Sequence, residues 1–266
     1  MNYQKIKISG FRLQISDDFP ADFFPNNTDT SFFADGQRSS FVKLPSSKFT
    51  RVFKFDVYFK GKIHNFILKQ YLNRSPLDAL KNLLRPCRAQ RAFKAAQMLK
   101  QYGFSTPDVV AAGKKTFAGI TTRNFLVTRE IKDFVSLPEI LIKNTPGKRE
   151  LIRQFGEVVG KMHANNIFHG DLRLGNVLVK TDNNQSVFIF LDNERTKKFS
   201  RLPKRLLLKN LVQISMFHGY ISNSDRIHFL DAYLAQQKTK LDGEKLAAEI
   251  TAGIEKRLAA KGIRTD

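Results

Sequence analysis

The chain has 266 residues, and its 42% of hydrophobic residues, including 24 Phe, suffice for the core of one large or two modest domains and exclude intrinsic disorder. A formal net charge of +21 favours polyanionic partners: nucleic acid, an anionic membrane surface, or a phosphorylated or acidic substrate. No apolar run approaches the ~20 residues of a transmembrane helix, and the single cysteine excludes an internal disulfide, so we expect a soluble, cytosolic protein.

The first 35 residues are predicted to form an irregular arm. Turn-forming residues interrupt every short apolar run of "SDDFPADFFPNNTDTSFFADG". The opening "MNYQKIKISGFRLQI" has neither the apolar stretch nor the cleavage site of a signal peptide. The sequence leaves open whether residues 1–35 fold onto the domain that follows.

A pair of antiparallel strands is predicted next. In "RVFKFDVYF" the large apolar residues alternate, which indicates a half-buried strand, and "KGK" follows as a turn. The expected partner strand is "IHNFILKQY", with Lys69 near its end. The residues that share the apolar face of the first strand are Phe53, Phe55, Val57 and Phe59.

A basic helix at roughly 86–102 follows, because Phe93, Ala96 and Leu99 share one face. Two further strands are predicted in "FSTPDVVAAG" and "RNFLVTREI". Together with the first strand pair, these elements predict a small β-rich, nucleotide-binding lobe with one helix over residues 36–132.

The remainder is predicted to be chiefly helical. "ELIRQFGEVVGKMHANN" carries one apolar stripe and ends at Asn165–Asn166, where asparagine tolerates a left-handed backbone. "NVLVK" and "SVFIFLD" flank the turn-rich "TDNNQ" and indicate a hairpin. Two or three helices follow in "LPKRLLLKNLVQISMFHGY", "SDRIHFLDAYLAQQ" and "DGEKLAAEITAGIEKRLAA", the second capped by Ser224-Asp225. The pattern predicts an α+β chain of two lobes, with a larger, mainly helical lobe over residues 133–266 and a boundary near 132–136.

The loop "HGDLRLGN" and the hairpin after it gather the polar residues expected to carry chemistry. Asp171 and Asn176 lie at the two ends of the loop, and Asp192 ends the second hairpin strand. Because a hairpin brings its ends together, we expect Asn176 and Asp192 side by side, with Asp171 facing them. A carboxylate beside a buried strand is costly without a positive partner. Oxygen ligands of this kind suit Mg²⁺, which shares its shell with phosphates and water.

This arrangement is typical of phosphoryl transfer. Asp171 is then free to orient and deprotonate an acceptor hydroxyl, and Arg173 is placed to steady the transferred phosphoryl group. Lys69, on a strand of the other lobe, would reach the α- and β-phosphates of a nucleotide.

"HGDLRLGN" followed by the strand-ending "FLDNER" resembles the catalytic and metal-binding loops of the protein-kinase-like superfamily. "FILKQY", "CRAQRAFKAAQMLKQYGFSTPDVVAAG", "LVTREI" and "KNLVQISMFHGYISNSDRIHFLDAYL" extend the likeness to the lipopolysaccharide core kinase family, whose members phosphorylate Kdo or heptose. The resemblance covers roughly residues 40–235. It implies a protein-kinase-like bilobal fold, ATP with Mg²⁺, and transfer of the γ-phosphate to a sugar hydroxyl. It also implies that Lys69 contacts the nucleotide phosphates. The base it implies is Asp171, and the metal ligands are Asn176 and Asp192.

Simpler interpretations of the same residues stay open. Lys69 is alternatively an exposed lysine on an edge strand, and Asp171 alternatively caps a turn. His169 is expected to hydrogen-bond the loop rather than to carry a proton. Glu194 is either a second metal ligand or a surface salt-bridge partner.

The loop that would cover the nucleotide phosphates departs from the family's pattern. "SSFVKLPSSKFTR" contains no glycine, so it cannot be a Gly-rich flap. Ser46, Ser47 and Lys48 are the candidates for contacting the phosphates, through their hydroxyls and charge.

The helix at 86–102 departs from the pattern as well. It contains no acid that could pair with Lys69, and Gln90 and Gln97 are the candidates closest in chemistry. A carboxylate from another segment would then have to hold the lysine, or the affinity for nucleotide is modest.

The function we expect is an ATP-dependent kinase acting on a sugar hydroxyl of lipopolysaccharide core at the inner face of the cytoplasmic membrane. A lipid-linked acceptor with phosphates and acidic sugars, anchored in an anionic bilayer, suits the net charge of +21. "TKKFSRLPKRLLLKN" interleaves basic residues with leucines. It is either an interfacial helix on that membrane or a helix of the large lobe with one solvated face.

Two other functions fit part of the pattern. A soluble small-molecule kinase of the aminoglycoside or choline type shares the HGD loop, but its acceptors are usually cationic and this chain has only 24 acidic residues. A catalytically weak kinase-like scaffold that binds a polyanion would explain the missing acid in the helix. We expect no nucleic acid as partner, because the sequence contains no recognised nucleic-acid module and its Phe residues read as core.

Overall fold

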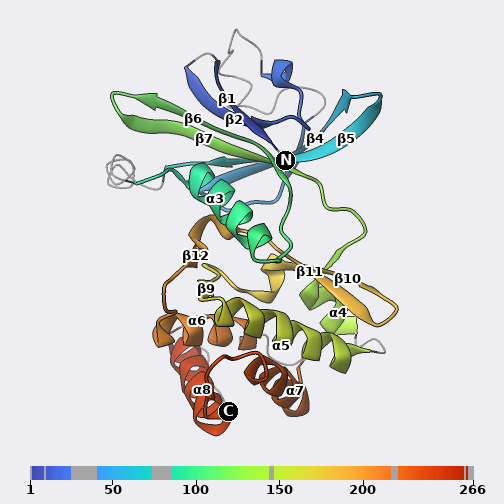
Figure 1. Cartoon of the computed structure of the whole chain (residues 1–266), viewed down its shortest axis with the longest axis vertical. Helices are drawn as coiled ribbons and strands as arrows, with labels where there is room; N and C mark the ends of the chain where they lie inside the picture. The colour runs from blue at the N-terminus through green and yellow to red at the C-terminus, as the bar shows by residue number, and fades with distance from the viewer. Residues whose placement is uncertain are drawn as a thin grey trace. The chain divides into compact units, whose positions relative to one another are not determined.

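The computed structural model describes residues 2–8, 10–24, 41–73, 85–143, 147–216, 221–260 and 262. The chain divides into two compact units (Figure 1). One is rich in β-strands and the other is mainly helical with a hairpin, which confirms the predicted α+β architecture. The first unit comprises Met1–Met98 and Pro107–Lys132, and the second comprises Leu99–Thr106 and Asp133–Asp266.

The first unit is built on a seven-stranded sheet in the order β1-β2-β6-β7-β5-β4-β3. Every pair of neighbouring strands is antiparallel. The predicted helix is present as α3 (Arg88–Gln101). The strands are β1 (Tyr3–Ile8), β2 (Phe11–Ser16), β3 (Val42–Leu44), β4 (Thr50–Phe59), β5 (Lys62–Tyr71), β6 (Val109–Phe117) and β7 (Ile120–Arg129).

The prediction of an irregular N-terminal arm is wrong for residues 3–16, which form β1 and β2. Phe11, Leu13 and Ile15 are buried and alternate with more exposed residues, as a strand with one core face requires. β2 extends the sheet by pairing with β6. This short alternation was masked by the turn-forming residues that follow it. Residues 25–35 of the predicted arm lie outside the described residues.

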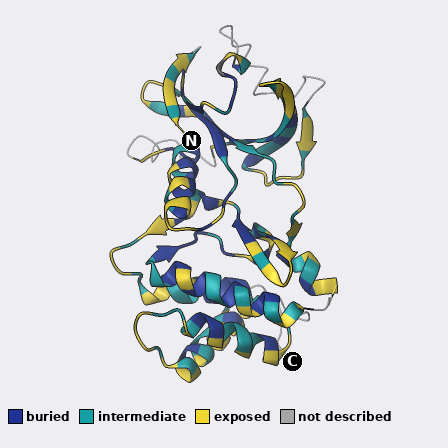
Figure 2. Ribbon diagram, turned by 45° about the vertical axis from the view of Figure 1, so that its right-hand side comes forward, coloured by how far each residue is buried: buried dark blue, intermediate teal, exposed yellow. Residues whose placement is uncertain are grey.

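Two apolar clusters cover the opposite faces of this sheet. One contains Phe66 and Phe125 together with Phe19, which follows β2. The other joins Leu126 to Phe93 of α3. Neighbouring residues of β7 belong to different clusters because side chains alternate along a strand. Figure 2 shows the resulting buried band along the strands.

The second unit contains five helices within its described residues, and none of the helices described in the chain is long and apolar enough to cross a membrane. α5 and α7 pack so closely at Gly160 that a Cβ on this residue would lie 2.7 Å from the carbonyl oxygen of Tyr233. α7 begins with a capping box formed by Ser222 and Asp225, so the predicted cap at Ser224-Asp225 is wrong by two residues. The helices are α4 (Leu137–Lys143), α5 (Lys148–Ala164), α6 (Lys204–Ser215), α7 (Asn223–Leu234) and α8 (Gly243–Ala259).

Short strands complete the second unit. The predicted hairpin is present as β10 and β11, and β8 joins it as a third strand. Its two-residue turn has Asn183 and Asn184 at positive φ, as such a turn requires. β9 pairs with β12 next to the predicted loop. The strands and 3₁₀ turns are β8 (Val135–Ser136), β9 (Ile167–Phe168), η2 (Leu174–Asn176), β10 (Val177–Asp182), β11 (Gln185–Phe190), η3 (Asn193–Arg195) and β12 (Lys197–Lys198).

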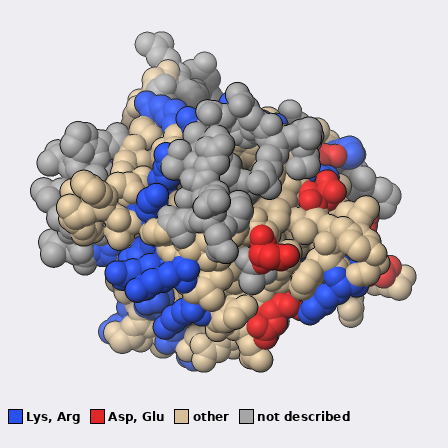
Figure 3. Space-filling model, turned by 90° about the horizontal axis from the view of Figure 1, so that it is seen from above, with Lys and Arg blue, Asp and Glu red and all other residues tan. Residues whose placement is uncertain are grey.

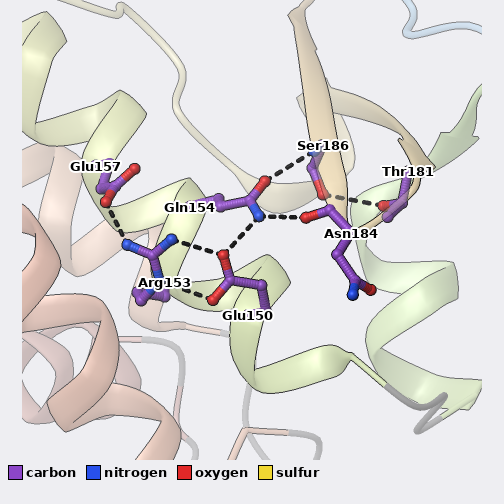
Figure 4. A network of polar contacts seen from close by, with 7 residues as sticks. All are labelled: Glu150, Arg153, Gln154, Glu157, Thr181, Asn184 and Ser186. Carbon is purple, nitrogen blue, oxygen red and sulfur yellow. Dashed lines mark hydrogen bonds and ion pairs between the residues drawn. The ribbon is translucent and has the colours of Figure 1, made fainter.

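A polar network holds the hairpin against α5 (Figure 4). Gln154 donates to the backbone carbonyl of Asn184 at 2.6 Å and accepts from the backbone N–H of Ser186 at 2.7 Å. Gln154 also donates to Glu150, whose pKa is lowered to about 2 by its hydrogen bonds with Arg153 and Gln154. The turn of the hairpin, at the end opposite Asn176 and Asp192, is therefore fixed to a helix.

Residues 99–106, the end of α3 and the segment that follows it, belong to the second unit although most of α3 belongs to the first. Ser105 forms a parallel bridge with Ile189 of β11, and the ring of Phe104 packs on that of Phe190. Thr106 accepts a hydrogen bond from Asn193 at 2.5 Å. The predicted boundary at 132–136 did not include residues 99–106 in the second unit, because their contacts are made with residues far away in the sequence.

Candidate active site

The predicted loop lies between β9 and β10 and includes η2, and its first glycine, Gly170, is required by close packing. A Cβ atom on Gly170 would lie 2.0 Å from the Cβ of Arg195 and 2.6 Å from that residue's carbonyl carbon. Any larger residue would push the loop away from η3, the turn that directly follows Asp192. The glycine of "HGD" therefore holds Asp171 and Asp192 in the same region of the second unit.

Three side chains hold the carboxylate of Asp171. Its Oδ1 atom accepts hydrogen bonds from Arg173 Nε at 2.9 Å and from Gln213 Nε2 at 3.1 Å. Its Oδ2 atom accepts from Asn176 Nδ2 at 3.2 Å. The side chain is 28% exposed, so the carboxylate is fixed in orientation yet open to solvent. A carboxylate that is oriented and accessible in this way can accept a proton from a bound hydroxyl.

Asn176 lies next to the end of β11, as the hairpin predicted. Its carbonyl accepts from the backbone N–H of Leu191 at 2.9 Å, and Asp192 is the next residue. Its Nδ2 atom also donates to the carbonyl of Asp171 at 2.8 Å. A carbonyl can only accept, so this bond fixes the side-chain amide and turns Oδ1 away from Asp171. The amide oxygen and the carboxylate of Asp192 are hard oxygen donors of the kind that Mg²⁺ takes.

The environment of Asp192 corrects one step of the sequence argument. The residue is exposed, with a left-handed backbone at φ 56°, so no metal is needed to offset its desolvation. Within the part of the chain that the structure describes, no group of three or more His, Cys, Asp or Glu side chains could hold a metal ion. A metal here would thus have few protein ligands and would complete its shell with phosphates and water, as Mg²⁺ does at kinase sites.

His169 is a structural residue, as expected. It is fully buried, and burial lowers its pKa. The backbone N–H of Asp171 donates to His169 Nδ1 at 3.3 Å, which leaves Nε2 to donate to Asn193 Oδ1 at 2.9 Å. Asn193 in turn donates to the carbonyl of Phe190 at 3.0 Å. Because both ring nitrogens are engaged in these bonds, the neutral imidazole, with its one hydrogen on Nε2, joins the loop to η3 and is not placed to pass a proton to a substrate.

Lys69 lies on a central strand of the first unit, which rules out the edge-strand alternative. It pairs with Val52 of β4 and Leu126 of β7, and Val52 pairs in turn with Leu44 of β3. The turn at residues 45–49 therefore leaves the sheet in the same row as Lys69, two strands away. Adjacent strands are about 4.8 Å apart, which places Leu44 roughly 10 Å from the lysine backbone.

The turn after β3 is tied by hydrogen bonds rather than built from glycine. The hydroxyl of Ser46 donates to the carbonyl of Thr50 at 3.0 Å, and the hydroxyls of Ser47 and Thr50 lie 2.9 Å apart. Arg88 of α3 donates to the carbonyl of Phe49 at 3.0 Å. The ammonium group of Lys48 stands over the ring of Phe49, 5.0 Å from its centre. Ser46, Ser47 and Lys48 are all exposed, and the turn presents the charge of Lys48 from a conformation that the two serine hydroxyls shape.

α3 offers Lys69 no carboxylate, because it contains neither Asp nor Glu. Gln90 accepts a hydrogen bond from the backbone N–H of Cys87 at 3.3 Å and so serves to cap the start of α3. Gln97 is exposed. The departure from the family's pattern is thus real for this helix.

The predicted residues fall into two groups. Asp171, Arg173, Asn176 and Asp192 come together in the second unit, whereas the phosphate-contacting candidates lie in the first. Sequence reasoning missed Gln213 of α6, whose amide contacts Asp171 directly. The signal was present, because Asn210 and Gln213 are polar residues three positions apart on the face of α6 that also carries Leu211 and Ile214 into the core.

The second unit also contains an apolar cavity of about 290 Å³ that is partly open to solvent. Side chains from α4, α5, α6, α7 and α8 line it, including Leu141, Ile214, Leu230, Ile250 and Ile254. Arg226 and Asn223 are among the polar residues at the cavity.

The fold and the loop define a kinase-like phosphotransferase. The model of the lipopolysaccharide kinase (Kdo/WaaP) family matches residues 36–233, and the chain belongs to this family. Membership identifies it as an enzyme of the phosphotransferase class, and kinases of this family use ATP.

The chain is also similar to individual proteins. The chain is 25% identical, over 187 residues, to the lipopolysaccharide core heptose(I) kinase WaaP of Escherichia coli, a match that spans 64% of this chain and 71% of that protein. It is 28% identical over 140 residues to the KEOPS complex subunit Bud32 of Pyrococcus abyssi, which covers 52% of this chain and 58% of the relative. A solved structure of WaaP in complex with acyl carrier protein has the same fold, with a TM-score of 0.65, 20% identity, and coverage of 92% of this chain and 98% of that one.

Proposed function

We propose that the enzyme transfers the γ-phosphate of ATP to a hydroxyl of Kdo or heptose in lipopolysaccharide core. The observation that carries the proposal is the carboxylate of Asp171, held by three side-chain donors, one of which is Asn176. The E. coli relative, a heptose(I) kinase of the core, supports a core sugar as acceptor.

Each residue has a distinct role in this proposal. Asp171 orients the sugar hydroxyl and accepts its proton while the hydroxyl oxygen bonds to the γ-phosphorus and the bond to the β-phosphate oxygen breaks. Arg173, 66% exposed and next to Asp171, stabilises charge on the transferred phosphoryl group. Asn176 and Asp192 would hold Mg²⁺, which neutralises phosphate charge when bound.

The first unit is proposed to bind the nucleotide and the second to bind the acceptor. Lys69 would contact the α- and β-phosphates, because it lies in the sheet row from which the Ser46–Lys48 turn emerges. The turn would contact phosphates through Lys48, whereas the hydroxyls of Ser46 and Ser47 are already used to shape it.

Transfer of labelled phosphate tests the acceptor. Purified enzyme with labelled ATP and Mg²⁺ is offered Kdo-containing core saccharide, heptose-containing core, an aminoglycoside and choline in separate reactions. We expect label on a core saccharide alone. Label on the aminoglycoside or choline would replace the proposal with the small-molecule kinase, and tight ATP binding without any transfer would favour the scaffold.

Association with an anionic membrane is the second part of the proposal. Lys197, Lys198, Arg201 and Arg205 are exposed in and near β12 and the start of α6, and their charges suit an anionic surface. Lys204 forms an ion pair with Glu249 of α8 at 2.5 Å and contributes less. Another view of the molecule, from above, shows one group of neighbouring Lys and Arg side chains on the left and further ones beside Asp and Glu side chains on the right (Figure 3).

Vesicle flotation tests this association. We expect weaker binding to phosphatidylglycerol vesicles when four basic residues are replaced by glutamine: Lys197, Lys198, Arg201 and Arg205. A matched control replaces four exposed lysines of the first unit: Lys5, Lys7, Lys43 and Lys62. Equal flotation of both variants and the wild type would remove the membrane from the proposal.

An acyl carrier protein is proposed as a partner, because the structural relative is a complex with one. The apolar cavity of the second unit would receive the acyl chain. Calorimetry should show binding of acyl-loaded carrier protein but not of the unloaded form, and Ile250→Trp, which fills the cavity, should abolish it. Equal binding of both forms would exclude the cavity as the acyl site.

A further inference from the structure

A series of buried polar side chains leads from α7 to the carboxylate of Asp171. Tyr233 of α7 lies 2.9 Å from His163 Nδ1, and His163 Nε2 lies 3.2 Å from Asn210 Oδ1. Asn210 Nδ2 donates to Gln213 Oε1 at 3.2 Å, and Gln213 Nε2 donates to Asp171 Oδ1 at 3.1 Å. The exposed fractions are 0% for Tyr233, 3% for His163, 0% for Asn210 and 5% for Gln213. A polar group is costly to bury unless it is paired, so each of these bonds constrains its neighbour.

The backbone of His169 fixes the direction of the whole series. Its N–H donates to Asn210 Oδ1 at 3.1 Å, and its carbonyl accepts from Asn210 Nδ2 at 2.7 Å. A backbone N–H can only donate and a carbonyl can only accept, so the amide of Asn210 has one possible orientation. The loop that carries Asp171 therefore sets the orientation of a residue on α6.

The other orientations follow from this one. Since Asn210 Oδ1 is an acceptor, His163 must carry its hydrogen on Nε2, and its Nδ1 must accept from the hydroxyl of Tyr233. Burial lowers the pKa of His163 to about 4 and raises the pKa of Tyr233, so the imidazole is neutral and the phenol protonated at pH 7. Since Asn210 Nδ2 is a donor, Gln213 must offer Oε1 to it and aim Nε2 at Asp171. Every donor in the series thus points toward the carboxylate.

We infer that Gln213 is a positioning residue for the base, and that Tyr233, His163 and Asn210 hold it in its donating orientation. The inference rests on the proposed function of Asp171. Hydrogen bonds arranged head to tail in a buried environment polarise one another and strengthen the last member. Gln213 therefore holds Oδ1 of Asp171 in place. This contact fixes the plane of the carboxylate, and with it the direction from which Oδ2 would meet the acceptor hydroxyl.

Arg173 does not make this role redundant. Its guanidinium contacts the same Oδ1 atom, but its side chain is 66% exposed. Exposed ion pairs hold their geometry weakly because two solvated side chains must be ordered together. Gln213 approaches from the buried side, where α6 and the loop share hydrogen bonds, so it is the more rigid of the two contacts.

The test separates positioning from simple structural support. Gln213→Met keeps the length of the side chain and removes the donor, and Gln4→Met, on exposed β1, is the matched control. A displacement of about 1 Å at a reacting group costs roughly 100-fold in rate, so we expect kcat for phosphate transfer to fall about 10- to 100-fold for Gln213→Met. The KM for ATP and the melting temperature should stay near the wild-type values. Tyr233→Phe, four hydrogen bonds away, should lower kcat several-fold with the same KM.

Gln213→Glu provides a second readout. It still accepts from Asn210 but offers Asp171 a second carboxylate in place of a donor, so kcat should fall at least as far as in Gln213→Met while the KM for ATP stays near the wild-type value. Loss of stability with kcat unchanged, or a rise in KM alone, would overturn the positioning role. A nitrogen NMR spectrum of the wild type that shows His163 protonated on Nδ1 would overturn it as well. A wild type that transfers no phosphate to any core saccharide would instead refute the proposed function, and the inference with it.

Discussion

The side-chain amide of Asn176 donates two hydrogen bonds to Asp171, one to the backbone carbonyl at 2.8 Å and one to Oδ2 of the carboxylate at 3.2 Å. The candidate base and a candidate metal ligand are therefore one hydrogen-bonded unit within a single loop. The bond to the carbonyl forces the amide oxygen of Asn176 away from the base. Metal binding and proton acceptance would accordingly use opposite sides of the same asparagine.

Asp192→Asn should weaken binding of Mg²⁺ without disturbing the fold, because Asp192 is exposed. Removing one charge from a site with few protein ligands should raise the Mg²⁺ concentration for half-maximal activity by roughly tenfold or more. A Mg²⁺ titration of the transfer rate measures this. Asp182→Asn, exposed at the far end of the same hairpin, is the control and should titrate like the wild type. An unchanged requirement in Asp192→Asn would remove this residue from the metal site.

Lys69→Met should lower kcat/KM for ATP because a charged contact to phosphate is lost. Hydrogen bonds to charged groups contribute about 1.5–3 kcal/mol, so the expected loss is roughly 10- to 100-fold. Lys62→Met, exposed at the start of the same strand, should change little. Steady-state kinetics with varied ATP distinguishes the two variants. Equal kinetics would mean that Lys69 does not contact the nucleotide.

Gly170→Ala and Gly175→Ala offer a matched pair within one loop. A Cβ at position 170 would collide with Arg195, whereas a Cβ at position 175 has no atom within 4 Å. Overpacking of this kind costs about 1–3 kcal/mol, so Gly170→Ala should lower the melting temperature and abolish transfer. Gly175→Ala should leave the melting temperature within a degree or two of the wild type. Similar melting curves for both would show that the loop is not packed against η3.

Acid should destabilise the protein through His163 and His169. Burial lowers the pKa of both, to about 4 for His163, so the unfolded chain binds protons below pH 6.5 that the folded one does not. The stabilisation is complete above pH 6.5 and is lost as pH falls toward 4. For His163 the loss is about 2 kcal/mol between pH 7 and pH 5.

Urea titrations at pH 7 and pH 5 measure this loss. His163→Gln should show a smaller drop in the free energy of unfolding, by about 2 kcal/mol, whereas His228→Gln, elsewhere on α7, should show the wild-type drop. A drop that is the same in all three proteins would contradict the burial of a neutral His163.

Local patterns predicted the elements that local physics determines. The alternation of Phe53 and Phe55, the stripe of α5 and the paired asparagines of the hairpin turn each reflect the period or φ angle that their element requires. β1 and β2 were missed because their alternation is short and their stability comes from pairing with β6, a strand some hundred residues away in the sequence. Strand pairing of this kind leaves no local signal.

The site residues were likewise predictable only where they lie close together in the sequence. Asp171, Asn176 and Asp192 could be grouped because one loop and one hairpin connect them. Gln213 could not, because it reaches Asp171 from a helix 42 residues later. Its polar character on a buried face of α6 was visible, but only the packing of α6 under the loop shows which group it contacts.

The role of Asp171 as the base of a core-saccharide kinase is tested by single-turnover kinetics. The measurement follows transfer of labelled γ-phosphate from ATP to lipopolysaccharide core saccharide, by the wild type and by Asp171→Asn. Asp171→Asn keeps the size of the side chain and removes the base. We expect a rate lower by about 10²- to 10⁴-fold, with ATP bound as tightly as by the wild type. Transfer at the wild-type rate by Asp171→Asn would contradict the assignment of Asp171 as the base.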